Sequence, residues 1–206
     1  LVFNPGEYVW GFSNLLWTLL VSLFDAAGLP IVLGARVLGL VCGAAVLALV
    51  FYAAPARPAW LAVWPALVLA VNEPFIHAAQ NGLETVFFTA LFFGGALLHV
   101  RALRRDSHTP WYMPLFLAAS LTRPEGPLLA AAAMGIDALA ALGGKRRNAV
   151  FRLKTGMLSF GLGYASYLAA MFFFYGQFLP NSFYAKVVHY NPRPLADGWA
   201  YVTAFF

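Results

Sequence analysis

The sequence has few charged residues: they make up 10% of its 206 residues, whereas 62% are hydrophobic. Soluble domains are closer to half apolar and a quarter charged. The mean hydropathy of +0.74 reflects the same imbalance. The composition therefore excludes an ordinary soluble protein and predicts an integral membrane protein.

Cysteine is almost absent, because Cys42 is the only one and lies in an apolar run. A single cysteine excludes a disulfide within the chain and a metal site built from cysteines. The sequence also lacks a glycine-rich nucleotide loop, a zinc-binding spacing and a Ser/His/Asp set. These absences predict no particular cofactor or metal ligand and leave only a divalent cation open.

The alternation of apolar and polar residues that marks a membrane β-strand is also missing. The apolar runs are continuous and rich in Leu, Ala and Phe, so we predict an all-α, multi-pass transmembrane helical bundle. The chain has room for about six or seven crossings of about 20 residues each. The apolar segments lie at about 30–52, 60–72, 84–100, 111–121, 127–142 and 156–175.

Two of these segments, 111–121 and 127–142, are short for a hydrocarbon core of about 30 Å, so we expect two arms that meet near the outer face. A further short run at 12–24 contains Trp17 and follows Trp10, and both tryptophans suit the membrane interface. The expected organisation is a single transmembrane domain over 1–206, with an extracytoplasmic loop and interfacial helix at 1–29, about six spans at 30–175 and a second extracytoplasmic loop at 176–206.

Basic residues gather in three connections between the apolar segments. They are Arg57; Arg101, Arg104 and Arg105; and Lys145, Arg146, Arg147, Arg152 and Lys154. The positive-inside rule places these connections in the cytoplasm. The formal charge of +5 then follows from topology and does not indicate nucleic-acid binding.

Four compact polar segments interrupt the apolar sequence, and with alternating spans all four fall on the extracytoplasmic side. They are Asn4–Glu7, Gln80–Glu84, Thr122–Gly126 and Pro180–Lys186. Polar and charged residues beside membrane spans are costly, and they commonly mark function. The four segments therefore predict a site at this face.

Two of the polar segments also have a structural explanation. Thr122 and Glu125 have the spacing of a capping box, and Asn81 with Glu84 has the form of a helix cap followed by an acid. Capping is a sufficient reason for Thr122, Asn81 and Glu84. Helices that start here would also point their N-terminal amides outward, where they could bind an anion.

Capping does not explain Arg123, whose charge costs about 2.5–3.5 kcal/mol at the centre of a bilayer. Arginine is a favoured bidentate partner of phosphate, and the alternatives are a snorkelling arginine or one paired with glutamate. Lys186 lies on the outer face, where the positive-inside rule requires no charge. It could neutralise a phosphate or belong to an interfacial belt.

The remaining polar residues give weaker signals. Glu7 lies in a Pro-Gly turn and is typical of a solvated loop acid. Glu73 and His77 are further outer-face candidates. His99 and His108 fall at the cytoplasmic end, and we predict no function for either.

The polar segments carry a family resemblance when they are taken in order. The residues concerned are Asn4–Glu7 with Ser13–Trp17, Asn81–Thr85, Thr122–Gly126, and Tyr175–Gly176 with Pro180–Lys186. Over nearly the whole chain, this set resembles bacterial membrane glycosyltransferases of the GT-C fold, related to the actinobacterial terminal arabinofuranosyltransferase. The chain departs from the family pattern at Tyr8, where arginine is usual, and at Phe12-Ser13, where Tyr-Thr is common.

The resemblance implies a multi-pass enzyme in the bacterial cytoplasmic membrane, with its active site on the extracytoplasmic side. Such an enzyme moves a sugar, arabinofuranose in the related transferase, from a polyprenyl-phosphate carrier to a glycan or lipid acceptor, among membrane lipids and without nucleic acid. It also implies a catalytic acid upstream of Leu1. Because the chain starts at Leu rather than Met and ends in an aromatic stretch, we expect a fragment that lacks this acid.

The expected mechanism divides the polar residues into two groups. We predict that Arg123, Lys186 and Asn181 hold the donor phosphate and stabilise the charge that develops on it. The residues predicted to bind the sugar or the acceptor are Asn4, Glu7, Asn81, Glu84, Thr122, Glu125 and Tyr184. The upstream acid would act as general base on the acceptor hydroxyl.

A transporter or flippase for a lipid-linked or anionic substrate is the alternative, since it would also use helix N-termini and a charge within the bilayer. It predicts an internal repeat, which the sequence does not show, and polar groups toward both faces. A structural subunit of a membrane complex is a third possibility, but it leaves Arg123 and Lys186 unexplained.

Overall fold

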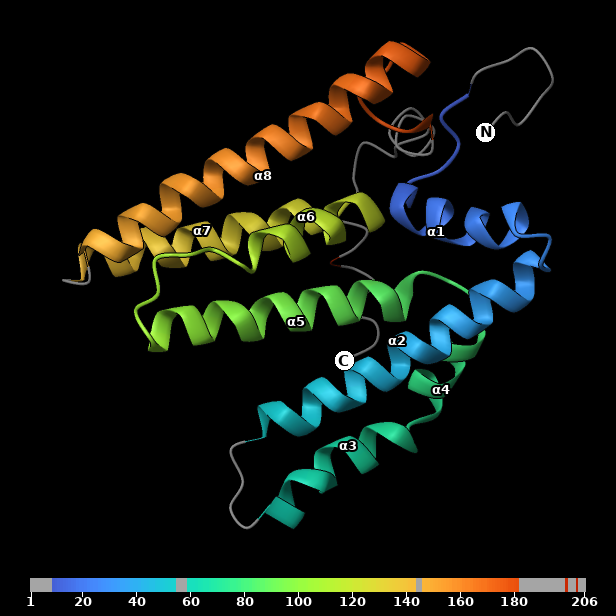
Figure 1. The fold of residues 1–206 in the computed structure, drawn as a ribbon, viewed down its shortest axis with the longest axis horizontal. Helices are drawn as coiled ribbons and strands as arrows, with labels where there is room; N and C mark the ends of the chain where they lie inside the picture. The colour runs from blue at the N-terminus through green and yellow to red at the C-terminus, as the bar shows by residue number, and fades with distance from the viewer. Residues whose placement is uncertain (1–8, 55–58, 144–145, 182–198, 200–202, 204–206) are drawn as a thin grey trace. The chain divides into compact units, whose positions relative to one another are not determined.

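The computed structural model describes residues 9–54, 59–143, 146–181, 199 and 203. The described residues form helices and no strand, as the continuous apolar runs predict (Figure 1). The helices are α1 (Leu15–Ala26), α2 (Ile31–Ala53), the 3-10 helix η1 (Ala59–Ala62), α3 (Val63–Ala70), α4 (Glu73–Gln80), α5 (Thr85–Arg104), α6 (Met113–Thr122), α7 (Gly126–Leu142) and α8 (Arg146–Tyr175). The chain divides into two compact units, one of residues 14–167 and one of residues 1–13 and 168–206.

Among the described residues, three helices are long and apolar enough to cross a membrane: α2, α5 and the part of α8 from Arg147 to Tyr175. Trp60–Ala70 and Glu73–Gln80 form a pair bent by 68°, which would count as a fourth span if the pair crosses as one. The helices α1, α6 and α7 are apolar but shorter, at 12, 10 and 17 residues.

In the unit of residues 14–167, α2 packs against α1, α3, α4 and α5, and α5 in turn packs against α6 (Figure 1). Small residues allow close approach between these helices. A Cβ atom at Gly39 of α2 would lie only 2.4 Å from the carbonyl oxygen of Ala79 on α4. The contact between α2 and α4 therefore has no room for even a methyl group at position 39.

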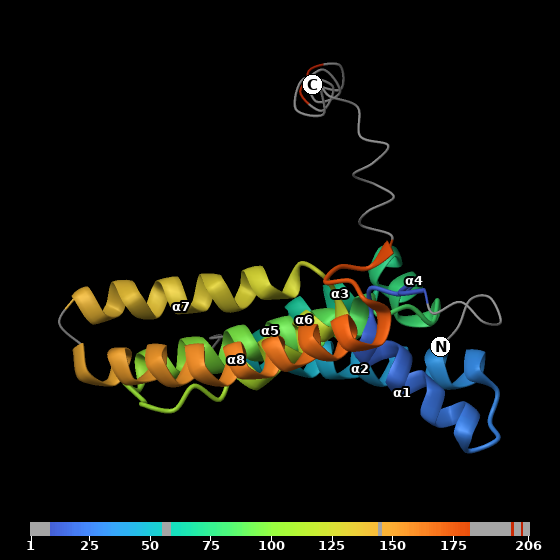
Figure 2. The ribbon, with the colours of Figure 1, turned by 90° about the horizontal axis from the view of Figure 1, so that it is seen from above.

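The helices α6 and α7 form an antiparallel hairpin. Tyr112, just before α6, bonds to Asp137 late in α7, and Gly126 at the start of α7 lies against Ser120 near the end of α6. Figure 2 shows α8 returning beside α7 after the connection between them. A core forms along the hairpin from Ala102, Tyr112, Met113, Phe116, Ala130 and Ala133.

Large apolar side chains cover much of the outside of these helices. Val41, Val68, Leu139 and Leu158 are 61%, 65%, 70% and 62% exposed. Extensive apolar surface of this kind marks contact with a partner or a membrane. These side chains suit the lipid-facing surface that the composition predicts.

The second unit is described over short segments only. In it, the ring of Tyr175 stacks on Trp10 with centroids 6.0 Å apart and meets Phe12 edge to face at 6.1 Å. The backbone N–H of Asn181 donates to the carbonyl oxygen of Trp10 at 2.9 Å. These contacts join the residues just before α1 to the last residue of α8 and to Asn181 after it.

Candidate functional site

The tip of the α6–α7 hairpin positions Arg123. The residue follows the last turn of α6 in an extended conformation, with φ −147° and ψ 146°, and its N–H donates to Ala119 O at 2.9 Å. Gly126 then starts α7 so close to α6 that a Cβ atom there would lie 2.3 Å from Ser120 Cα. The tight turn carries the guanidinium out of the hairpin, beside the start of α5.

Arg123 forms an ion pair with a carboxylate on each side. Its Nε lies 3.4 Å from Glu125 Oε2, and its Nη1 lies 3.8 Å from Glu84 Oε1. The side chains of Arg123, Glu84 and Glu125 are 32%, 19% and 55% exposed. The guanidinium carbon also lies 5.7 Å from the centre of the Phe88 ring, at cation–π distance.

Asn14 brings a third chain segment to the same place. Its Nδ2 donates to Glu84 Oε2 at 3.2 Å, and its Oδ1 accepts from the Thr18 hydroxyl at 3.1 Å. The rings of Trp17 and Phe87 meet at a tilt of 37°, with centroids 5.7 Å apart, and hold α1 beside α5 at this point. We refer to Asn14, Glu84, Arg123 and Glu125 as the Glu84 cluster.

The chemistry of the Glu84 cluster suits a polar ligand that carries an anion. A guanidinium has five N–H donors, so Arg123 keeps donors beyond those that face the two carboxylates. Exposed ion pairs such as the one with Glu125 contribute only about 0–1 kcal/mol, so a phosphate could displace that partner. The carboxylates accept hydrogen bonds of the kind that sugar hydroxyls donate.

Other residues of these segments have structural partners. Asn81 ends α4, and its Oδ1 accepts from Leu83 N–H at 2.9 Å. Thr122 is fully buried, and its hydroxyl donates to Ala118 O at 2.8 Å. The remaining predicted residues Asn4, Glu7, Tyr184 and Lys186 lie outside the described residues, and Asn181 belongs to the other unit.

Both predicted helix caps are wrong. The N-cap residue of α5 is Glu84 and that of α7 is Glu125, and neither helix has a side-chain hydrogen bond at its cap. Thr122 instead is the last residue of α6, and the helix ends there because Arg123 is extended, as expected for a residue before proline. Asn81 makes a local turn with Leu83 four residues before α5 begins, and Gly82 within this turn adopts a φ of 74°.

A cation that the sequence did not single out lies near this region. Arg36 of α2 lines a hollow of ≈ 340 Å³ with Leu40 and Gln80, the last residue of α4. In the described part of the chain, Arg36 has no ion-pair partner. The sequence could have pointed to Arg36, because a charged residue within a long apolar helix is uncommon.

Sequence reasoning also missed a buried polar cluster toward the other end of α5. Arg152 Nε donates to Asp137 Oδ1 at 2.9 Å, and His99 Nε2 lies 3.5 Å from the same oxygen. The Tyr112 hydroxyl donates to Asp137 Oδ2. We refer to His99, Tyr112, Asp137 and Arg152 as the Asp137 cluster.

The Asp137 cluster is shielded from solvent. Asp137 and Arg152 are 0% and 1% exposed, and Arg152 Nη1 also donates to Ser107 O at 2.6 Å. Tyr112 lies just before α6, and burial, followed by the hydrogen bond to Asp137, raises the pKa of its phenol. The hydroxyl therefore remains a donor, and the cluster joins α5, α7, α8 and the connection before α6.

Within the ranges that the structure describes, no three His, Cys, Asp or Glu side chains gather closely enough to hold a metal ion. Comparison of the chain with protein-family models, curated proteins and solved structures finds no match. The Glu84 cluster and the sequence itself are therefore the features that point to a function.

Proposed function

We propose that the chain is part of a multi-pass membrane glycosyltransferase that moves a sugar from a polyprenyl-phosphate carrier to a glycan or lipid acceptor outside the bacterial cytoplasmic membrane. The observation that carries this proposal is the Glu84 cluster. Three segments that are distant in the sequence, at Asn14, Glu84 and Arg123–Glu125, meet there in an otherwise apolar set of helices. Two of them include residues of the polar segments that resemble the GT-C glycosyltransferases, and Asn14 falls in the matching 13–17 stretch.

Arg123 would bind the phosphate of the donor and stabilise the charge that develops as the sugar leaves. Its exposed pairing with Glu125 keeps the guanidinium in place before the donor binds. Glu84 is held by Asn14, so it would offer a fixed carboxylate oxygen to a sugar hydroxyl. Lys186 and Asn181 remain proposed as further phosphate ligands, and the general base would be an acid upstream of Leu1.

A transporter for a lipid-linked substrate is the second candidate because of one observation. The pair formed by Trp60–Ala70 and Glu73–Gln80 bends by 68°. Discontinuous helices of this kind bind substrates in many secondary transporters. The bend carries Glu73 and His77, whose side chains lie 3.5 Å apart and are 85% and 75% exposed.

The test is sugar transfer by the full-length protein in membrane vesicles, with a labelled polyprenyl-phosphate sugar and an isolated cell-envelope acceptor. Loss of a donor that stabilises transition-state charge lowers rates by about 10²–10³-fold, so we expect such a loss for Arg123→Ala. Arg104→Gln removes an exposed charge elsewhere and serves as the control. The amount of inserted protein must be equal in each sample.

The outcomes separate the two candidates. Unchanged transfer in both Arg123→Ala and Lys186→Ala would rule out the phosphate role of these residues. Movement of the labelled lipid across the bilayer without transfer, and with sensitivity to Glu73→Gln, would favour the transporter instead.

A further inference from the structure

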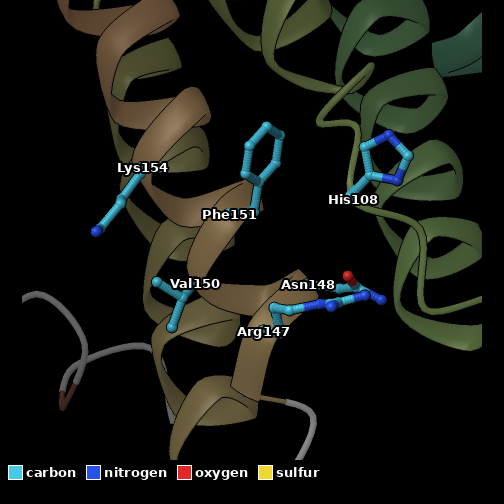
Figure 3. A pocket seen from close by; sticks show the side chains of 6 residues that line it. All are labelled: His108, Arg147, Asn148, Val150, Phe151 and Lys154. Atoms are coloured by element: carbon cyan, nitrogen blue, oxygen red, sulfur yellow. The ribbon is translucent and has the colours of Figure 1, made fainter.

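A basic hollow of ≈ 370 Å³ opens beside the beginning of α8, at the end of the helices that the positive-inside rule places in the cytoplasm (Figure 3). It is lined by His108 from the α5–α6 connection and by Arg147, Asn148, Val150, Phe151 and Lys154 from α8. The Glu84 cluster contains none of these residues. The basic hollow is therefore a separate feature that the proposed transfer reaction does not use.

No acid among the described residues forms an ion pair with the two cations of the basic hollow, Arg147 and Lys154. Both side chains are exposed. Asp106 lies near the basic hollow, because its Oδ2 accepts from Asn148 at 3.0 Å. Its Oδ1 lies 3.7 Å from Arg152 Nη1. Its carboxylate therefore already has partners.

The helix itself adds to this charge. The first turn of α8 contains no acidic residue. The N-terminal end of a helix carries a partial positive charge, so cations beside it are unfavourable and an anion is favourable. An anion in the basic hollow would offset the repulsion between the positive end of the helix and Arg147.

The shape of the basic hollow combines a polar rim with an apolar wall. In Figure 3, Arg147 and Asn148 extend toward the side where His108 lies, whereas Lys154 lies on the other side of Phe151. Phe151 is 50% exposed and meets the His108 ring edge to face, with centroids 5.8 Å apart. A ligand that is anionic at one end and apolar at the other fits these surroundings better than a free ion.

We propose that the basic hollow binds the phosphate of an anionic phospholipid headgroup in the cytoplasmic leaflet. Basic pockets between membrane helices on this side are suited to such lipids, and each Lys or Arg near the surface favours binding by about fivefold. The proposal requires that the chain lies in a membrane, as the proposed function does, but it does not require sugar transfer. Failure of the transfer assay would leave it unaffected.

The experiment is native mass spectrometry of the full chain in detergent, titrated with phosphatidylglycerol or with phosphatidylcholine of the same acyl chains. We expect a bound phosphatidylglycerol that phosphatidylcholine does not replace. Arg147→Gln and Lys154→Gln should each weaken it by about fivefold. Arg104→Gln removes the same charge from the same end of the helices without touching the hollow, so it should have little effect.

Two results that involve the variants would overturn the proposal. One is equal loss of phosphatidylglycerol in all three variants, which would show a diffuse charge effect. The other is displacement of the lipid by low millimolar inorganic phosphate, with a phosphate adduct that disappears in Arg147→Gln, which would identify a soluble anion as the ligand. Equal binding of both lipids would also contradict it.

Discussion

Arg152 on α8 donates through Nε to Oδ1 of Asp137 on α7 at 2.9 Å, and their side chains are 1% and 0% exposed. The pair lies late in α7 and early in α8, so it fastens the two helices where the chain turns from one to the other. Two buried charges are costly to desolvate and hold together only when each has further partners. Tyr112 and Ser107 supply those partners.

Breaking this pair should strongly destabilise the fold. In Asp137→Asn, the buried guanidinium of Arg152 would lose its closest carboxylate and keep only that of the partly exposed Asp106, 3.7 Å from Nη1. Breaking a buried pair in this way costs about 3–5 kcal/mol. We expect a loss of that size in the free energy of unfolding, measured by denaturant titration in mixed micelles. Arg104→Gln is the control, because its exposed side chain has no ion-pair partner in the described part of the chain.

A double variant separates the stabilisation from the ion pair from the cost of burying its two charges. Apolar replacement of both members, Asp137→Leu with Arg152→Met, removes both desolvation costs together and should lose less stability than the two single changes summed. Strict additivity of the two single effects would show that the residues do not stabilise each other.

The hairpin turn that presents Arg123 should tolerate no side chain at Gly126. A methyl group there would meet the backbone of Ser120 at 2.3 Å, so α6 and α7 would have to separate. Overpacking of this kind costs about 1–3 kcal/mol, and we expect Gly126→Ala to lower the unfolding free energy by at least that much.

Gly135→Ala is the matched control in the same helix, because nothing lies within 4 Å of a Cβ atom at that position. Alanine has the higher helix propensity by about 1 kcal/mol, so this variant should be neutral or slightly more stable. Similar effects of the two changes in the same unfolding titration would argue against the tight hairpin.

Glu125 should compete with the donor phosphate for Arg123. Its ion pair is exposed, and such pairs contribute about 0.2–1 kcal/mol, so removal of the charge should change stability little. In the proposed transferase, Glu125→Gln would lower the KM for the lipid donor by about 1.5- to 5-fold, as that energy no longer opposes phosphate binding. The measurement is initial transfer rate against donor concentration.

Glu84→Gln is the comparison for Glu125→Gln. Glu84 also receives a hydrogen bond from Asn14, so its replacement should disturb the α1–α5 contact and lower kcat as well. A higher KM in Glu125→Gln would indicate that Glu125 binds the donor directly and does not compete with it.

Much of the helical pattern could be predicted from apolar runs. The segments at 30–52 and 127–142 nearly coincide with α2 and α7. The start of α8 could not be predicted in this way, because the charged stretch before residue 156 is typical of a loop. The helix in fact begins at Arg146, and burial of Arg152 against Asp137 explains why a charged residue continues it.

The helix α4 was missed for a different reason. The polar residues of this segment favour a connection between spans, although the sequence also contains a signal for the start of a helix. Asn72 accepts from Phe75 N–H at 3.1 Å, and Pro74 lies in the first turn, where proline is favoured. Local capping chemistry thus outweighed the polar appearance of the segment.

The candidate site was predictable in its residues but not in its contacts. The cost of a charge in an apolar stretch singled out Arg123, and pairing with a glutamate was among the alternatives. Which glutamate it meets depends on the packing of α5 beside the α6–α7 hairpin, which no local pattern specifies. The hydrogen bond from Asn14 to Glu84 joins residues 70 positions apart, so it also depends on how the helices pack and not on a local pattern.

Membrane orientation is the remaining prediction. The helix α5 has 20 residues, so its ends are about 30 Å apart, and its last turn contains Arg101 and Arg104, with Arg105 directly after it. The positive-inside rule then places Leu83 outside and Gly143 inside. In a Cys42→Ala background, Leu83→Cys should react with a membrane-impermeant maleimide in intact cells, and Gly143→Cys only after the membrane is opened.

Both positions suit the labelling experiment. Leu83 is 54% exposed, and Gly143 is exposed with no atom closer than 3.6 Å to a Cβ atom. The denatured variants, which should label equally, control for intrinsic thiol reactivity. The opposite labelling pattern would place the Glu84 cluster on the cytoplasmic side. That one result would exclude both extracytoplasmic sugar transfer and lipid binding in the cytoplasmic leaflet.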